Sequence, residues 1–200
     1  KLRIGTHIQQ ATETIRQLES FGFLPNHLLA EPCSRNTALI IGLMAKIISA
    51  DDPDSVMAVF PSDHVVTNTE NFVNVIQKAE TMAKKGYLVT LGIPPTQPET
   101  GFGYIKQGSK TKEDESIFQV EHFAEKPNLS KATEYLKSKT YFWNCGVFVW
   151  KTSVILEELQ QHAENIYSQL ENLKNCLQRS GKKLNHFELD EKGSKIFSAL

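Results

Sequence analysis

Asp63 is the residue whose type and position point most directly to chemistry. It follows an uncharged apolar run, residues 55–60, that ends in Pro61-Ser62-Asp63-His64. A short apolar run bounded by turn-forming residues predicts a strand buried on both faces, as in a parallel sheet. Ligands of open α/β sheets bind beyond the carboxyl ends of such strands. Asp63 is therefore a candidate metal ligand, and the alternative is that it caps the helix that follows.

Three further clusters, the last made of two segments, carry groups suited to binding a ligand. The segment from Glu31 to Thr37 places a carboxylate and the Arg35 guanidinium at a helix start, where free N–H groups attract anions; a capped helix with a surface arginine is the alternative. Gly101-Phe102-Gly103 would let the backbone approach a ligand, although a plain β-turn has the same pattern. Glu125-Lys126 offers a hydroxyl acceptor beside a cation, or it is only a solvated strand edge. Asn144, in Asn144-Cys145-Gly146, interrupts an otherwise apolar strand, where Asn and Gly are both depleted.

The elements that must position these groups alternate along the chain. Apolar periodicity predicts helices over 6–20, 38–48, 69–85 and 130–137, strands over 27–31, 56–60, 87–91, 117–123 and 141–150, and a polar helical tail from Thr152. Either Ser34 or Asn36 is expected to cap the second helix. The alternation of helix and strand up to Leu91 predicts an α/β fold with a mostly parallel central sheet flanked by helices.

Composition excludes several classes of protein. The chain has 200 residues, 40% hydrophobic and 22% charged, with a formal net charge of -1, which suits one globular core and gives no sign of a nucleic-acid or acidic-membrane partner. Its three cysteines are far apart in sequence, which favours free thiols in a reducing cytoplasm. No apolar run is long enough to span a bilayer, the N-terminus does not have the pattern of a signal peptide, and the histidines show no metal-ligand spacing.

Taken in order, the motifs resemble those of the sugar-phosphate nucleotidyltransferases, and most closely those of the mannose-1-phosphate guanylyltransferases. The motifs are Glu31-Pro32-x-x-Arg35-Asn36-Thr37-Ala38, Phe60-Pro61-Ser62-Asp63-His64, Gly92-Ile93-x-Pro95-Thr96-x-Pro98-Glu99-Thr100-Gly101-Phe102-Gly103-Tyr104-Ile105, Phe123-x-Glu125-Lys126-Pro127 and Trp143-Asn144-x-Gly146-x-Phe148. Each is weak alone, but together they cover about Glu31 to Trp150 in the expected order. The resemblance implies a Rossmann-like, glycosyltransferase-A-like fold. We expect a single domain, with a parallel half over about 1–100 and a sugar-binding half over about 101–200.

The resemblance also implies roles for individual residues. Asp63 would bind Mg²⁺ and act in catalysis together with Lys126, which would bind the sugar phosphate. The nucleotide would be bound by Glu31, Arg35, Asn36, Thr37 and Ser62, and the sugar by Gly103, Glu125, Asn144 and Gly146. The implied reaction transfers GMP from GTP to mannose 1-phosphate and releases pyrophosphate. Positioning and charge neutralisation would supply most of the rate enhancement. A homodimer is left open.

Two parts of the family pattern have no counterpart in these residues: the Gly-rich, Arg-containing phosphate loop and a second acidic metal ligand. We therefore expect a central piece of the enzyme, with impaired catalysis as it stands. Cys145 also replaces the Ser or Thr that is frequent in the family. Two alternatives stay open: thymidylyl or adenylyl transfer to glucose 1-phosphate, and a non-catalytic homologue that binds a sugar nucleotide and regulates a partner. Whether an isomerase domain follows is also open.

Overall fold

The computed structural model describes residues 1–112, 114–181 and 185–200, and the chain forms two compact units. Unit 1 contains residues 1–57 and 151–200, and unit 2 contains residues 58–150. The chain passes from unit 1 to unit 2 within β3 (Val56–Val59) and returns at the end of β7 (Tyr141–Lys151). None of the described helices is long and apolar enough to cross a membrane.

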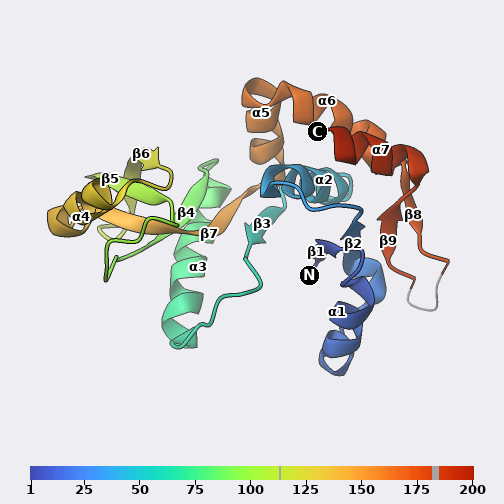
Figure 1. The fold of residues 1–200 in the computed structure, drawn as a ribbon, viewed down its shortest axis with the longest axis horizontal. Helices are drawn as coiled ribbons and strands as arrows, with labels where there is room; N and C mark the ends of the chain where they lie inside the picture. Colours follow the sequence, from blue (N-terminus) through green and yellow to red (C-terminus); the bar gives the residue numbers. More distant parts are fainter. Residues whose placement is uncertain (113, 182–184) are drawn as a thin grey trace. The chain divides into compact units, whose positions relative to one another are not determined.

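Unit 1 is built on a four-stranded sheet in the order β1-β2-β9-β8 (Figure 1). Its strands are β1 (Ile4–His7), β2 (Leu28–Glu31), β8 (Leu177–Arg179) and β9 (Phe187–Leu189), and its helices are α1 (Ala11–Leu18), α2 (Thr37–Ser49), α5 (Thr152–His162), α6 (Glu164–Asn175) and α7 (Glu191–Ala199), with short 3-10 turns at Glu19–Phe21 and Pro25–His27. β1 and β2 are parallel and are joined through α1, as a parallel connection requires. β2 and β9 are also parallel, whereas β8 and β9 are antiparallel.

The core of unit 1 is formed mainly by α2 against the C-terminal helices. Leu43 of α2 is fully buried in a cluster that includes Leu170 and Leu173 of α6 and Phe197 of α7. Gly42 lets the helices approach closely, because a Cβ there would lie 3.0 Å from Cδ1 of Leu159. α2 is apolar on nearly all sides because it is buried by helices as well as by the sheet.

Unit 2 contains the second sheet, ordered β3-β7-β5-β6 with β4 also pairing with β7. Its remaining elements are α3 (Thr69–Lys84), β4 (Val89–Ile93), β5 (Tyr104–Lys110), β6 (Phe118–Ala124) and α4 (Leu129–Ser138). β5 is hydrogen-bonded to β6 on one side and to β7 on the other, and Tyr104 lies opposite both Ala124 and Trp143. Figure 1 shows α4 lying beside β5 and β6, and the Tyr135 ring of α4 contacts the ring of Tyr104 at 5.3 Å between centroids.

The α/β class and the sheets flanked by helices are confirmed. The predicted helix over 69–85 is found as α3, the helix over 130–137 as α4, and the second helix begins after Asn36, one of the two expected caps. The expected single domain, with a parallel half over about 1–100 and a sugar-binding half over about 101–200, stays a prediction.

Strand direction in unit 2 differs from the prediction of a mostly parallel sheet. The pairs β4–β7, β5–β7 and β5–β6 are all antiparallel. The helix-strand alternation that favours parallel pairing stops at β4, and β5 and β6 are consecutive strands that pair as a hairpin does.

Three local predictions were wrong. Thr6 and His7, predicted to begin the helix over 6–20, belong to β1 instead, because they pair with Ala30 and Glu31 of β2. The tail after Thr152 contains β8 and β9 besides its helices. β3 is not buried on both faces: Ala58 and the following Phe60, which share one face of the extended chain, are exposed.

The helix after the Pro61–His64 loop is capped by Asn68 and not by Asp63. The Asn68 side chain accepts a hydrogen bond of 2.9 Å from the Asn71 N–H, at the first turn of α3. Asp63 lies five residues earlier, in an exposed turn. The capping alternative for Asp63 is therefore wrong, and its expected role as a metal ligand stays a prediction.

We predict that Asn68→Ala lowers the free energy of unfolding by about 1 kcal/mol, because it removes an N-cap acceptor. Asp63→Ala is the matched control and should change it by less than about 0.5 kcal/mol, as expected for an exposed side chain. Urea unfolding of both variants measures the difference. Equal losses for the two variants would contradict the assignment of the cap.

Candidate functional site

Asp63 is available to a ligand. It lies in the loop between β3 and α3, and Ser62 and His64 beside it are exposed as well. In the described part of the chain, no hydrogen bond or ion pair engages the Asp63 carboxylate. An exposed carboxylate beyond a strand end, with no structural partner, is suited to binding a cation or a polar substrate.

Gly103, Glu125 and Asn144 converge at one end of the unit 2 sheet. Tyr104 lies opposite Ala124 of β6 and Trp143 of β7, and both strand pairs are antiparallel. Gly103, which precedes Tyr104, is therefore level with Glu125 and with Asn144. The Gly103 carbonyl accepts a hydrogen bond of 2.8 Å from the Asn144 N–H. A Cβ added to Gly103 would lie 2.7 Å from Oε2 of Glu125 and 3.6 Å from Cβ of Asn144. Any residue other than glycine at this position would force the Glu125 carboxylate to move from its observed place.

The Asn144 side chain is oriented by its own strand. Its Oδ1 accepts a hydrogen bond of 3.2 Å from the Gly146 N–H and lies 3.5 Å from the Thr90 hydroxyl. Gly146 has a φ of 70°, a left-handed conformation that favours glycine. The predicted break at Asn-Cys-Gly is thus a local distortion within a continuous strand, next to a register shift between β4 and β7. With Oδ1 fixed, the Nδ2 hydrogens have no acceptor among the described residues and can be donated to a ligand hydroxyl.

Glu125 and Lys126 provide opposite charges beside this convergence. Lys126 Nζ lies 3.7 Å from Glu125 Oε1, and the side chains are 66% and 72% exposed, so this ion pair contributes little to stability. Lys126 has a φ of 41°, an unfavourable conformation for a residue with a Cβ. Such strain is concentrated at functional sites. The pair is better suited to contacting a ligand than to holding the fold together.

The predicted nucleotide segment lies in unit 1. Glu31 ends β2 and is partly buried, and burial raises the pKa of its carboxyl group. Asn36 occupies the N-cap position of α2, but its side chain makes no capping hydrogen bond, and Thr37 begins the helix. The Arg35 guanidinium donates to the Ser198 carbonyl at the end of α7, and Cys33 Sγ lies 3.3 Å from the Ser198 hydroxyl. The nucleotide-binding roles of these residues and of Ser62 stay predictions.

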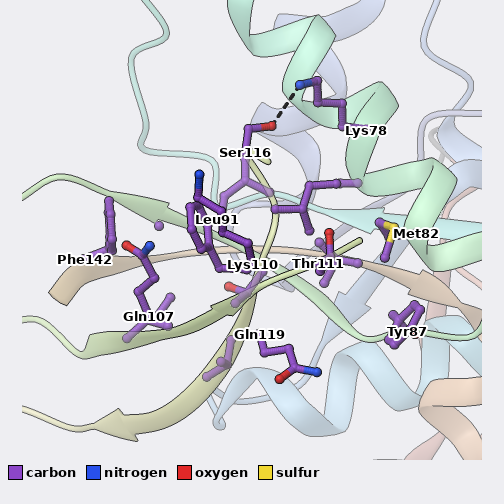
Figure 2. Close-up of a pocket in the computed structure, with 18 of the residues that line it drawn as sticks. Lys78, Met82, Tyr87, Leu91, Gln107, Lys110, Thr111, Ser116, Gln119 and Phe142 are labelled. Carbon is purple, nitrogen blue, oxygen red and sulfur yellow. Dashed lines mark hydrogen bonds between the residues drawn. The ribbon is translucent and has the colours of Figure 1, made fainter. Parts of the chain in front are cut away.

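A cavity of about 900 Å³ lies elsewhere in unit 2, between α3 and the β5–β6 hairpin (Figure 2). None of the predicted site residues lines it. Lys78 at its rim donates to the Ser116 hydroxyl at 2.8 Å and pairs with Asp114 at 2.7 Å. This lysine holds the pKa of Asp114 well below its usual range. The charge of Lys78 is thus already engaged in joining α3 to the hairpin turn.

Sequence reasoning missed the residues that hold the site in place. Thr90 donates to the Val147 carbonyl at 3.2 Å beside Asn144, and Tyr104 hydrogen-bonds to Glu99. The signal that could have found Tyr104 is its aromatic ring beside Ile105 directly after Gly103, because a tyrosine that becomes buried needs a partner for its hydroxyl.

Comparison with known proteins decides the family. The profile of the family described as nucleotidyl transferase matches residues 5–188. The chain belongs to the nucleotidyl transferase family. It is 42% identical over 146 residues to a protein named putative mannose-1-phosphate guanylyltransferase from Vibrio cholerae serotype O1, covering 73% of this chain and 31% of that protein. It is 40% identical over 158 residues to a mannose-1-phosphate guanylyltransferase of Salmonella muenchen, covering 78% and 33%.

Solved structures agree with the family assignment. A structure titled mannose-6-phosphate isomerase from Helicobacter pylori has a TM-score of 0.83 at 31% identity, covering 96% of this chain and 72% of that one. A structure titled mannose-1-phosphate geranyltransferase from Thermus thermophilus has a TM-score of 0.75 at 28% identity, covering 98% and 51%. The predicted nucleotidyltransferase fold is confirmed. The chain spans about a third of the length of the curated relatives it matches.

We predict that Gly103→Ala weakens binding of a sugar 1-phosphate about tenfold, equivalent to about 1.4 kcal/mol. The new Cβ would displace the Glu125 carboxylate, which is the mobile end of a side chain, so the melting temperature should change little. Gly181→Ala is the control, because a Cβ there would meet no atom of the described residues within 4 Å. Titration calorimetry and thermal unfolding measure both effects. Unchanged binding, or a large loss of stability, would contradict the site geometry.

Glu31 gives a pH-dependent prediction. Burial raises the pKa of the Glu31 carboxyl group in the folded state. At pH values above the pKa that this group has in the unfolded chain, ionisation of Glu31 therefore lowers the free energy of unfolding. Glu31→Gln should therefore raise the melting temperature at neutral pH. The gain should disappear as the pH falls below the ordinary pKa of glutamate, about 4.3. Thermal unfolding across this range is the measurement, and a gain independent of pH would exclude the desolvation cause.

Proposed function

We propose that the protein containing these residues transfers GMP from GTP to mannose 1-phosphate, giving GDP-mannose and pyrophosphate. The observation that carries the proposal is the convergence of Gly103, Glu125 and Asn144, which together offer a close backbone, a hydroxyl acceptor and a free amide donor. These are the groups that recognise a polyol. The choice of guanine and mannose is supported by two relatives of 40% and 42% identity that carry the name mannose-1-phosphate guanylyltransferase.

The proposed reaction is an in-line displacement. A phosphate oxygen of mannose 1-phosphate bonds to the α-phosphorus of GTP, and the bond from that phosphorus to the bridging oxygen of the pyrophosphate breaks. Glu125 and Asn144 would orient the sugar, and Lys126 would neutralise charge on its phosphate. The Glu31–Thr37 segment and Ser62 would contact the nucleotide. Holding the two anionic reactants in line and stabilising their charge together account for most of the rate enhancement in phosphoryl-transfer chemistry.

The residues present fit a Mg²⁺ ion held partly by substrate. The described residues contain no group of three or more His, Cys, Asp or Glu side chains that could hold a metal ion alone. Mg²⁺ is commonly held by one or two carboxylates together with substrate phosphates and water, and the exposed Asp63 carboxylate would supply one such ligand. When bound, Mg²⁺ supplies positive charge that offsets the charge of the triphosphate in the transition state.

The test of the proposal uses the complete open reading frame that contains these residues. With Mg²⁺, GTP and mannose 1-phosphate should release pyrophosphate with a kcat/KM at least about 100-fold above that of dTTP or ATP with glucose 1-phosphate. A higher kcat/KM with dTTP and glucose 1-phosphate, or with ATP and glucose 1-phosphate, would show that the proposed substrates are wrong. Tight binding of a sugar nucleotide without pyrophosphate release would favour the regulatory alternative.

We predict that Asp63→Ala lowers kcat by about 100-fold or more, a loss typical of removing a group that stabilises transition-state charge. The melting temperature should stay unchanged, since the carboxylate makes no structural bond in the described chain. Glu134→Ala removes another exposed carboxylate, on α4, and is the control for both measurements. Retained turnover in Asp63→Ala would exclude Asp63 as a metal ligand.

A further inference from the structure

The hydroxyl of Tyr104 binds both backbone polar groups of one residue. It accepts a hydrogen bond of 3.0 Å from the Glu99 N–H and donates one of 2.9 Å to the Glu99 carbonyl. Tyr104 has no exposed surface, so water cannot replace either bond without a structural change. The loop from Glu99 to Gly103 is therefore closed at its base by a single buried side chain.

The Tyr104 ring is itself fixed by the sheet and by α4. The Tyr104 backbone pairs with β6 on one side and with β7 on the other. Its ring contacts that of Tyr135, and Tyr135 is stacked on Tyr141 with 3.8 Å between ring centroids. The hydroxyl thus projects from a rigid base toward the loop.

The same loop is braced internally and leads directly into the sugar site. The Glu99 carboxylate accepts a hydrogen bond of 2.9 Å from the Gly101 N–H. Two residues later, the Gly103 carbonyl accepts from the Asn144 N–H, and its Cα lies against the Glu125 carboxylate. A loop that moved at Glu99 would carry Gly103 away from both partners.

We propose that Tyr104 is a positioning residue for the sugar phosphate, which sets the place of the Gly103 backbone through its two hydrogen bonds to Glu99. This inference rests on the proposed function and deepens it: Tyr104 does not touch the substrate but fixes the backbone that recognises its hydroxyl groups. Binding of the sugar phosphate, rather than the chemical step, depends on this hydroxyl.

The test compares Tyr104→Phe with Tyr141→Phe in the complete protein. Both keep a ring in the same aromatic stack, but the Tyr141 hydroxyl lies 3.3 Å from Nε2 of His122 and not in the loop. Tyr104→Phe should raise KM for mannose 1-phosphate about tenfold, as expected for losing hydrogen bonds used only in binding. Its KM for GTP and its kcat should stay within about twofold of the wild type. Tyr141→Phe should change none of the three.

A second readout does not depend on activity. Amide hydrogen exchange of Asn144 should be faster in Tyr104→Phe than in Tyr141→Phe, because the Gly103 carbonyl is the acceptor of that N–H. Unchanged Asn144 exchange would overturn the inference even if the wild type is active, and so would faster exchange with an unchanged KM for mannose 1-phosphate. If the wild type does not turn over the proposed substrates, the proposed function fails separately, and Asn144 exchange alone decides the positioning role.

Glu99→Ala is the variant to use if Tyr104→Phe does not fold. It loosens the loop without altering the buried ring, and it should change Asn144 exchange and the KM for mannose 1-phosphate in the same direction as Tyr104→Phe.

Discussion

The close approach of the Gly103 backbone to the Glu125 carboxylate is the constraint on which the candidate site depends. A single methyl group at residue 103 would lie 2.7 Å from a carboxylate oxygen, so backbone and acid can share this space only because residue 103 is glycine. The approach in turn requires β5 to pair with both β6 and β7 in a fixed register. Sheet topology brings the three groups together, and the two hydrogen bonds of the Tyr104 hydroxyl hold the loop that leads into Gly103.

In unit 2, the polar group that fixes the backbone near the site is buried, whereas the charged groups expected to bind a ligand are exposed. The buried Tyr104 hydroxyl is satisfied by the protein, as its desolvation requires, whereas the buried Nε1 of Trp143, opposite Tyr104, has no hydrogen-bond partner among the described residues. The exposed groups expected to meet ligands are not satisfied by the protein: Asp63 has no partner among the described residues, and Lys126 is held only in a weak surface pair. The satisfied bonds fix the backbone, and the exposed groups remain free for substrate. The sequence-based candidates were chosen as groups that could bind a ligand. The buried hydroxyl of Tyr104, which fixes the backbone instead, was therefore not among them.

Much of the fold could be predicted from local pattern, and its failures have physical causes. α3 and α4 have clear apolar periodicity and were placed within a residue or two. β1 and β9 are short and depend on pairing with β2, a long-range contact that no local pattern records. Asp63 and Asn68 both precede α3 and are both residue types favoured at N-caps; the predicted start at residue 69 already favours Asn68, and the observed Asn68–Asn71 bond identifies it as the cap. The convergence of Gly103 with Glu125 and Asn144 followed from family resemblance; the register shifts in β4–β7 and β5–β6 prevent its derivation by counting residues.

A double-mutant cycle between Gly103→Ala and Glu125→Ala tests the central claim most directly, with KM for mannose 1-phosphate as the readout. If the alanine methyl group acts by displacing the Glu125 carboxylate, it has nothing left to displace once that carboxylate is removed. The account therefore predicts that the double variant has the same KM as Glu125→Ala alone, within about twofold. Additive effects of the two substitutions would contradict it, because they would show that Gly103 and Glu125 act independently.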